Sequence, residues 1–318
     1  GSDIAIFISG DMVVARCGLL DEIRAKVNKL NAEIPAEKIL FNVTHTHCGP
    51  SHYYEDSIPP HDGIEIASSD EYRNFLSTET AKAVAEAYES REEGGIAYGY
   101  GYAVVSHSRR VMYFDDLSKR EGADVTSSLH VDGHTRMYGN TDDTMFSGYE
   151  AGADHFINLL YTFDKNEKLT GAVINVPCPS QNSEQEYYLT ADYWHNVREA
   201  LREKYGDINI ISQCAAAGDL SPRILHYKKA QDRRYRLKYA DTQIDPRVDA
   251  KTEMYTRFDI AERICQGFDE VLSWARKDIK WELPMEHTVK TIELARRLIS
   301  DDEYEFCRIE LEKLNNET

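Results

Sequence analysis

The sequence lacks the features that mark membrane-spanning and nucleic-acid-binding proteins. No stretch of its 318 residues approaches the roughly 20 consecutive apolar residues of a membrane helix, and its start has neither the basic nor the apolar segment of a signal peptide. Positive charge is scarce, because 37 lysines and arginines stand against 55 acidic residues and the formal net charge is -18. A surface this acidic repels polyanions, so we expect neither nucleic-acid binding nor stable membrane insertion.

Cysteines are few, and their spacing shows no pairs. The six lie mostly beside apolar runs, at positions 17, 48, 178, 214, 265 and 307. A free cysteine in such surroundings behaves as a small hydrophobe, so a disulfide framework is not expected. Scattered free thiols slightly favour the cytoplasm, although a chain of this size needs no disulfides even when it is exported.

The apolar pattern predicts an α/β fold. Residues 4–9 form a continuous apolar run that is typical of a strand buried on both faces. A helix with apolar residues from Leu19 to Leu30 follows, and then a second strand over residues 39–43, which ends directly before His45. Further strands are expected at residues 96–105, 156–163, 171–177 and 208–211, and helices at 70–90, 190–205 and 254–272.

Several boundaries can also be predicted. Gly94-Gly95 is expected to terminate the helix at 70–90, Gly206 to cap the helix at 190–205, and Ser300 with Glu303 to form a capping box. Residues 115–153 show little periodicity and are expected to form a long loop. We therefore expect a single α/β domain over residues 1–318, with a mostly parallel or mixed sheet flanked by helices and a mainly helical portion at 245–318.

Three polar segments follow predicted strands, at residues 44–52, 178–183 and 213–223. Ligands of α/β sheets bind outside the carboxyl ends of strands, so these segments are candidates for a site. The first holds His45 and His47, whose rings would share one face if the backbone stays extended and could then bind one metal ion. Two histidines that only form hydrogen bonds in a polar loop are an equally good interpretation of this pattern.

A catalytic metal site usually has three protein ligands, so a third ligand is needed. His52 and His61 are near in sequence, and Cys178 at the end of another predicted strand could supply a thiolate. For Cys178, a buried apolar side chain is the better interpretation.

The other polar residues allow two interpretations each. Ser221, in the turn Gly-Asp-Leu-Ser-Pro, could be a nucleophile or an orienting donor, or it could stabilise the turn together with Asp219. No histidine can be assigned as its base from the sequence. Arg109 and Arg110 suit anion or carbonyl binding, but adjacent arginines are more often surface ion-pair donors. The basic stretch at residues 228–238 is best explained as a solvated helix face.

Taken in order, these segments resemble the neutral/alkaline (non-lysosomal) ceramidase family. Residues 42–50, Asn-Val-Thr-His-Thr-His-Cys-Gly-Pro, are similar to the family's His-Thr-His-Ser-Gly-Pro segment. Residues 213–222 are similar to its Gln-x-Asn-x-Gly-Asp-Val-Ser-Pro segment, and residues 4–11 and 108–110 also resemble family segments. The resemblance runs through most of the chain.

The resemblance implies a zinc-dependent amidohydrolase of linear amides, with a ceramide-like N-acyl sphingoid lipid as substrate and a role in lipid metabolism. It implies that His45 and His47 hold the zinc, that an activated water attacks the amide carbonyl, and that the ion stabilises the oxyanion. Ser221 and Asp219 would lie beside the scissile bond. Arg109, Arg110 and Gln181 would contact the substrate.

The chain departs from the family in three ways. The family's third histidine ligand follows the strand that here ends at residues 177–181, where no histidine occurs, and the Asn expected before Gly-Asp is absent from the stretch 215–217. The family's remaining Glu and Tyr ligands would fall beyond Thr318, which suggests a core fragment of a longer catalytic domain. A hydrolase of a polar amide or ester, and a binding protein without the metal, are therefore alternatives to a ceramidase-like amidase.

Overall fold

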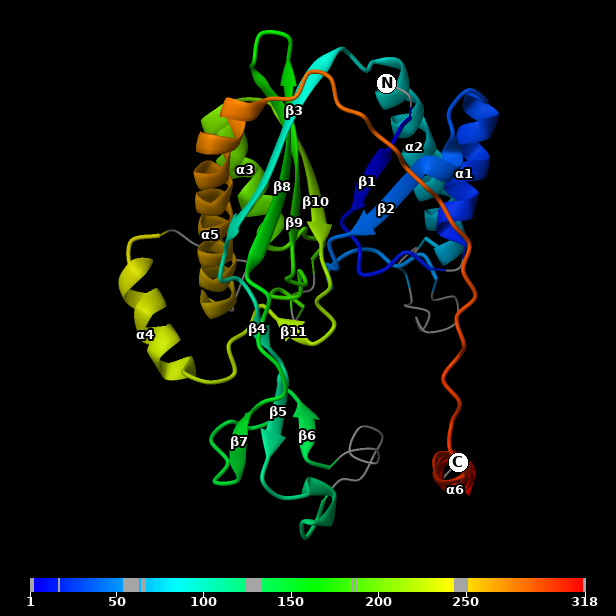
Figure 1. Ribbon diagram of the computed structural model, residues 1–318. Helices are drawn as coiled ribbons and strands as arrows, with labels where there is room; N and C mark the ends of the chain where they lie inside the picture. Colours follow the sequence, from blue (N-terminus) through cyan, green and yellow to red (C-terminus); the bar gives the residue numbers. More distant parts are fainter. Residues whose placement is uncertain are drawn as a thin grey trace.

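The computed structural model describes residues 3–16, 18–53, 63, 67–123, 133–184, 186, 188–242 and 251–316, the last range without the side chains of 251–253. The fold is mixed α/β, as the sequence predicts. It contains a four-stranded sheet with helices on one face, a two-stranded sheet with its own helices, and smaller sheets beyond the strand ends (Figure 1).

The N-terminal part is a parallel strand–helix–strand unit. Strands β1 (Ile6–Gly10) and β2 (Ile39–Val43) pair in parallel, with Ile6 opposite Ile39. Helices α1 (Leu19–Leu30) and α2 (Ser69–Glu89) pack on each other and on these strands, and a short 3-10 turn, Ala36–Lys38, leads into β2. The core of this unit contains the apolar face of α1, namely Leu19, Ile23 and Val27.

Two predictions for this unit are wrong. Strand β1 is not buried on both faces, because Phe7 is 39% exposed. Helix α2 ends at Glu89, and its C-cap Ser90 donates its backbone N–H to Glu86. Gly94 and Gly95 do not terminate the helix but begin the next strand.

The central sheet has the strand order β10-β9-β8-β3. Strands β9 (Leu169–Val176) and β10 (Asn209–Cys214) are parallel, whereas β3 (Gly94–Tyr102) and β8 (Phe156–Asp164) complete the sheet in antiparallel register. Helices α3 (Tyr193–Tyr205) and α5 (Lys251–Ala275) cover one face, as Figure 1 shows. The main core lies between these two helices and the sheet. It includes the predicted apolar faces of both helices, among them Trp194, Val197, Leu201, Ile264 and Phe268.

Helix α3 begins later than residue 190, because Asp192 is its N-cap and accepts a hydrogen bond from the backbone N–H of Tyr193. Its end agrees with the prediction, since Gly206 at the C-cap has φ 85°, a conformation that favours glycine.

Residues 115–153 are not one loop. Strand β5 (Arg110–Tyr113) pairs with β6 (Thr135–Met137) and β7 (Phe146–Tyr149) in a small antiparallel sheet, and Leu117–Lys119 forms a 3-10 turn. These strands are only three or four residues long, which is too short to give a visible alternation in the sequence. The two-stranded sheet of β4 (His107–Ser108) and β11 (Leu220–Ser221) connects this region to the central sheet.

The C-terminal part is helical apart from an extended segment. Helix α4 (Lys228–Lys238) contains the basic stretch, and Tyr235 is its buried residue. A 3-10 turn, Arg276–Asp278, follows α5, and an extended segment leads to α6 (Asp301–Asn316). The capping box is present, because Ser300 and Glu303 each accept a hydrogen bond from the other's backbone N–H. Among the described residues, no helix is both long and apolar enough to cross a membrane.

Candidate functional site at the carboxyl ends of the parallel strands

The carboxyl ends of the parallel strands meet at one place. Ser9 of β1 donates its hydroxyl to the carbonyl of Ser212 on β10, and Asn42 of β2 exchanges two hydrogen bonds with the main chain of Cys214. These contacts set the two-stranded sheet beside the central sheet. The polar segments that follow β2, β9 and β10 therefore come together.

The segment after β2 alternates between buried threonines and more accessible histidines. Thr44 and Thr46 are buried, and their hydroxyls bond to Asp11 and to the carbonyl of Thr190. The backbone at His45 has φ 62°, so it is left-handed, and the condition that it stays extended is not met. The rings of His45 and His47 nevertheless lie together, with their centroids 5.0 Å apart in an edge-to-face arrangement.

Oxygen acceptors hold the Nδ1 atoms of both imidazoles. His45 Nδ1 lies 2.7 Å from the carbonyl oxygen of Val13, and His47 Nδ1 lies 3.0 Å from the Glu184 carboxylate. Carbonyl and carboxylate oxygens only accept, so Nδ1 carries the proton in each ring. In the neutral form of each ring Nε2 then keeps its lone pair, which is the arrangement that metal-binding histidines adopt.

The Glu184 carboxylate has a second partner, the guanidinium of Arg223. Arg223 also donates to the carbonyls of Gln181 and Asn182, at 3.2 and 3.3 Å, and its backbone N–H donates to the Ser221 hydroxyl at 3.1 Å. A single arginine thus joins the segment after β9 to the turn that contains Ser221.

The pKa of His47 is below its ordinary value of 6.5. Burial is the main cause, and the neighbouring His45 adds to it, whereas Glu184 acts in the opposite direction. His47 is therefore neutral at neutral pH, so its contact with Glu184 is a hydrogen bond from a neutral imidazole.

A cavity of about 490 Å³ opens beside His45. Arg109 and Gln181 also line it, so three of the residues predicted for the site share one cavity. The turn after β10 supplies another wall without bulky side chains, formed by Ala215, Ala217 and Gly218. The remaining wall is mainly apolar and consists of Val14, Ala15, Phe41, Asn42, Val43, Pro179 and Cys214.

Arg109 and Gln181 are linked through Tyr138. The Arg109 guanidinium donates two hydrogen bonds to the Gly218 carbonyl and one, at 3.2 Å, to the Tyr138 hydroxyl. Gln181 donates its side-chain amide to the same hydroxyl. Arg110, in contrast, pairs with Glu150 and does not belong to the residues that line this cavity.

Asp219 and Ser221 follow Gly218 in the turn after β10. Ser221 is fully buried and stands opposite His107 in the ladder between β11 and β4, a neighbour that the sequence could not assign. Asp219 is partly exposed, and its carbonyl accepts a hydrogen bond from the Arg109 backbone at 3.0 Å. Neither side chain lines the cavity.

The candidates for a third metal ligand occupy different environments. Cys178 is in the main core, where its thiol contacts the Val105 carbonyl and where burial raises its pKa well above the ordinary value. His52 is buried and accepts the Arg16 backbone N–H. His61 lies outside the described residues. Within the part of the chain that the structure describes, no group of three or more His, Cys, Asp and Glu side chains could hold a metal ion.

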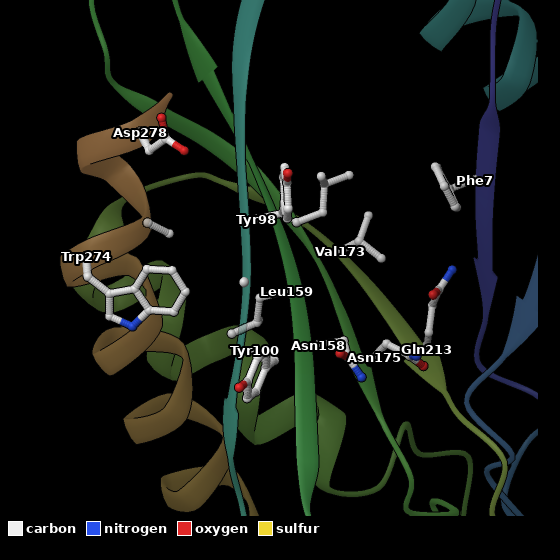
Figure 2. A pocket seen from close by; sticks show the side chains of 13 residues that line it. Phe7, Tyr98, Tyr100, Asn158, Leu159, Val173, Asn175, Gln213, Trp274 and Asp278 are labelled. Carbon is white, nitrogen blue, oxygen red and sulfur yellow. The ribbon is translucent and has the colours of Figure 1, made fainter. Parts of the chain in front are cut away.

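A larger cavity, of about 640 Å³, lies on the central sheet (Figure 2). Aromatic and amide side chains line much of it, including Tyr98, Tyr100, Asn158, Asn175 and Trp274. Gln213, the first residue of the predicted polar segment 213–223, also lines it, but none of the predicted catalytic, metal-binding or substrate-binding residues does. The smaller cavity beside His45 is therefore the candidate functional site, because the groups able to perform chemistry gather there.

Comparison with solved structures shows that this fold is that of neutral ceramidases. A ceramidase complexed with C2 superimposes with a TM-score of 0.55 at 18% sequence identity, over 85% of this chain and 36% of the ceramidase chain. Neutral ceramidase from Pseudomonas aeruginosa gives a TM-score of 0.54, with the same identity and the same coverage of both chains. This chain therefore spans little more than a third of each ceramidase.

The family resemblance of the sequence is thus confirmed at the level of the fold. No family model matches the sequence, and no curated protein matches it either.

Sequence reasoning missed Glu184, Arg223 and Tyr138. Glu184 follows the segment at residues 178–183 directly, so a carboxylate beside a candidate ligand segment was the available signal. Arg223 is the last residue of the predicted segment 213–223, so its position was a signal of the same kind. Tyr138 gave no such signal, because it reaches the site from the small sheet of β5, β6 and β7.

Proposed function

We propose that this chain acts as a metal-dependent hydrolase of amide bonds, of the ceramidase type, with His45 and His47 as zinc ligands. The observation that carries the proposal is that oxygen acceptors hold both Nδ1–H groups while no hydrogen bond to either Nε2 is found among the described residues. Of the two rings, His45 lines the cavity together with Arg109 and Gln181. The ring separation of 5.0 Å agrees with the roughly 5 Å expected for two imidazoles on one tetrahedral ion.

The residues of the chain fit such an ion in part. Two imidazoles supply two of the usual three protein ligands, and the third remains unassigned. When bound, zinc would polarise an amide carbonyl and lower the pKa of a water molecule. The neutral state of His47 suits this role, because a protonated imidazole cannot be a ligand.

The other polar groups would bind and orient the substrate. The guanidinium of Arg109 lies at the cavity with Tyr138 and the Gly218 carbonyl as its partners, so its direction is fixed before a substrate arrives. It would donate to a carbonyl of the substrate near the scissile amide. Gln181 shares the Tyr138 hydroxyl and would present its amide to the same region. Ser221 and Asp219 would support the turn that carries Gly218.

An N-acyl sphingoid lipid or a related amide is the substrate class that we propose first, because the fold is that of neutral ceramidases and one cavity wall is mainly apolar. A polar amide or ester is the second candidate. It is favoured by the guanidinium and the two amide side chains, Asn42 and Gln181, in the same cavity.

A substrate panel tests the proposal. N-acyl sphingosines of short and long acyl chain, N-acyl amino acids and simple esters would be incubated with the purified chain, with and without a chelator. We expect release of the acyl group from at least one amide, loss of this activity with chelator or in His45→Ala, and no loss in Tyr98→Ala, which changes the other cavity. A chelator-insensitive activity, or equal activity in His45→Ala, would contradict the proposal.

A further inference from the structure

Three amide side chains form a row across the face of the central sheet that α3 and α5 do not cover. Asn158 of β8 lies opposite Asn175 of β9, and Asn175 lies opposite Gln213 of β10. Tyr100 of β3 extends the row, because it lies opposite Asn158. Figure 2 shows these four side chains at one level of the larger cavity. Neighbouring strands are about 4.8 Å apart, so the three amides span roughly 10 Å.

The fold itself gives no reason for these amides. Asparagine is depleted in β-strands, where β-branched and aromatic residues are favoured. Within the described part of the chain, the side chains of Asn158, Asn175 and Gln213 have no hydrogen-bond partner. Asn175 and Gln213 are nevertheless half-buried. The donors and acceptors of the row therefore remain for a ligand.

Apolar and aromatic side chains surround the amide row. The next row along the strands consists of Tyr98, Leu160 and Val173. Phe7 of β1 also lines the cavity. Tyr98 is 58% exposed and Tyr100 is 55% exposed, so both rings can be reached from solvent. An aromatic ring offers an apolar face on which the C–H groups of a ligand can pack.

Charge is nearly absent from this cavity, although charged residues make up 29% of the chain. Among the described residues that line it, Asp278 alone is charged, and its carboxylate pairs with Lys280. A phosphate or carboxylate ligand would find no lysine or arginine on these walls to pair with. The cavity therefore suits an uncharged ligand.

We propose that this cavity binds a neutral oligosaccharide. Sugar hydroxyls both donate and accept hydrogen bonds, and a primary amide offers both kinds of group in return. The C–H face of a sugar ring would pack on Tyr98 or Tyr100. The row is about as long as two linked sugar rings. The cavity volume of about 640 Å³ lies within the range of roughly 300–1,000 Å³ that ligand sites have.

An extended peptide is the competing ligand, because amides also bond to a peptide backbone. A peptide that joins a sheet pairs with the main chain of an edge strand and runs along it. The amide row instead runs across the strands, from Tyr100 on the edge strand β3 to Gln213 on β10. Its direction favours a ligand that meets side chains rather than a strand edge.

Isothermal titration calorimetry of the full chain tests the proposal. The probes are tetrasaccharides of glucose, mannose, galactose and N-acetylglucosamine, with a heparin tetrasaccharide as the charged comparison. We expect at least one neutral probe to bind and the heparin tetrasaccharide not to bind. Asn175→Ala removes the middle of the row and should weaken this binding by about 2- to 10-fold. Tyr100→Ala should weaken it by a similar factor.

Asn209→Ala is the matched control. Asn209 is an exposed asparagine on β10, as Gln213 is an amide on that strand, but it does not line the cavity. This variant should bind the sugar as wild type does. Urea denaturation of every variant shows that it is folded before its affinity is compared.

The proposal is overturned if no neutral probe binds, if Asn175→Ala and Tyr100→Ala bind as tightly as wild type, or if the heparin tetrasaccharide binds as well as the neutral probes. A dimer in light scattering that Tyr100→Ala abolishes would also overturn it, because a second copy would then cover this face. The cavity is separate from that beside His45. Sugar binding therefore stands or falls independently of the proposed hydrolase activity.

Discussion

The histidines of this protein differ in the hydrogen-bond partners of their ring nitrogens, and these partners decide which nitrogen could bind a metal ion. His45 and His47 keep Nε2 available, whereas His52 uses Nε2 to accept a backbone N–H. The sequence shows that the first two lie two residues apart, but it does not show which ring nitrogen is occupied. That information comes from Val13 and Glu184, which are distant in sequence and could not be predicted from the His-Thr-His pattern.

His107 gives a prediction for the dependence of stability on pH. Burial, and then His155 and Arg263, lower its pKa from 6.5 to about 4. The unfolded chain therefore binds a proton between pH 6.5 and pH 4 that the folded chain does not bind. The contribution of His107 to stability is complete above pH 6.5 and is lost as the pH falls through this window.

We expect the free energy of unfolding, measured by urea denaturation at several pH values from 7.5 to about 4.5, to fall more steeply for wild type than for His107→Gln. The difference between the two proteins should grow below pH 6.5. Parallel curves for the two proteins would show that the folded chain does not keep His107 neutral.

Among the elements, β3 shows how the sequence encodes close packing. Its glycines and tyrosines alternate, so Gly99 and Gly101 face α5, while Tyr98, Tyr100 and Tyr102 are exposed on the other face. A Cβ atom on Gly99 would lie 2.4 Å from the Trp274 ring, and one on Gly101 would lie 2.8 Å from Val271. The helix can therefore approach this strand only where side chains are absent.

Replacement of Gly99 by alanine tests this packing. Because the added methyl group forces Trp274 and α5 to move, we expect a loss of about 1–3 kcal/mol in the free energy of unfolding. Tyr98→Ala on the exposed face of the same strand is the control, with a smaller expected loss. A Gly99→Ala protein as stable as wild type in urea denaturation would show that α5 is not packed so closely.

The length of an element and the burial of one of its faces explain which elements the sequence predicts. Helices α3 and α5 were predicted because each has apolar residues at helical spacing, Trp194 and Val197 in α3 and Ile264 and Phe268 in α5. All of them face one core. Strands β5, β6 and β7 were not, because they are short and owe their pairing to neighbours from other parts of the chain. The strand-end position of the site followed from the fold class, whereas Glu184, Arg223 and Tyr138 depend on tertiary contacts.

On the scale of the whole molecule, the site exists only because two sheets lie side by side. The bonds between Asn42 and Cys214 and between Ser9 and Ser212 bring the ends of β1, β2 and β10 together. His45 comes from the first sheet and the wall of Ala215 and Gly218 from the second. The fold is shared with neutral ceramidases, of which this chain spans 36% of the length.

The central claim is that His45 and His47 bind a metal ion, and the metal content of the purified full chain tests it most directly. Protein prepared without chelator would be analysed by inductively coupled plasma mass spectrometry, beside a His45→Ala/His47→Ala double variant of equal purity and confirmed fold. The account predicts near-stoichiometric zinc in wild type and its loss in the double variant. Wild type without metal after exposure to zinc, or the same zinc content in both proteins, would contradict it.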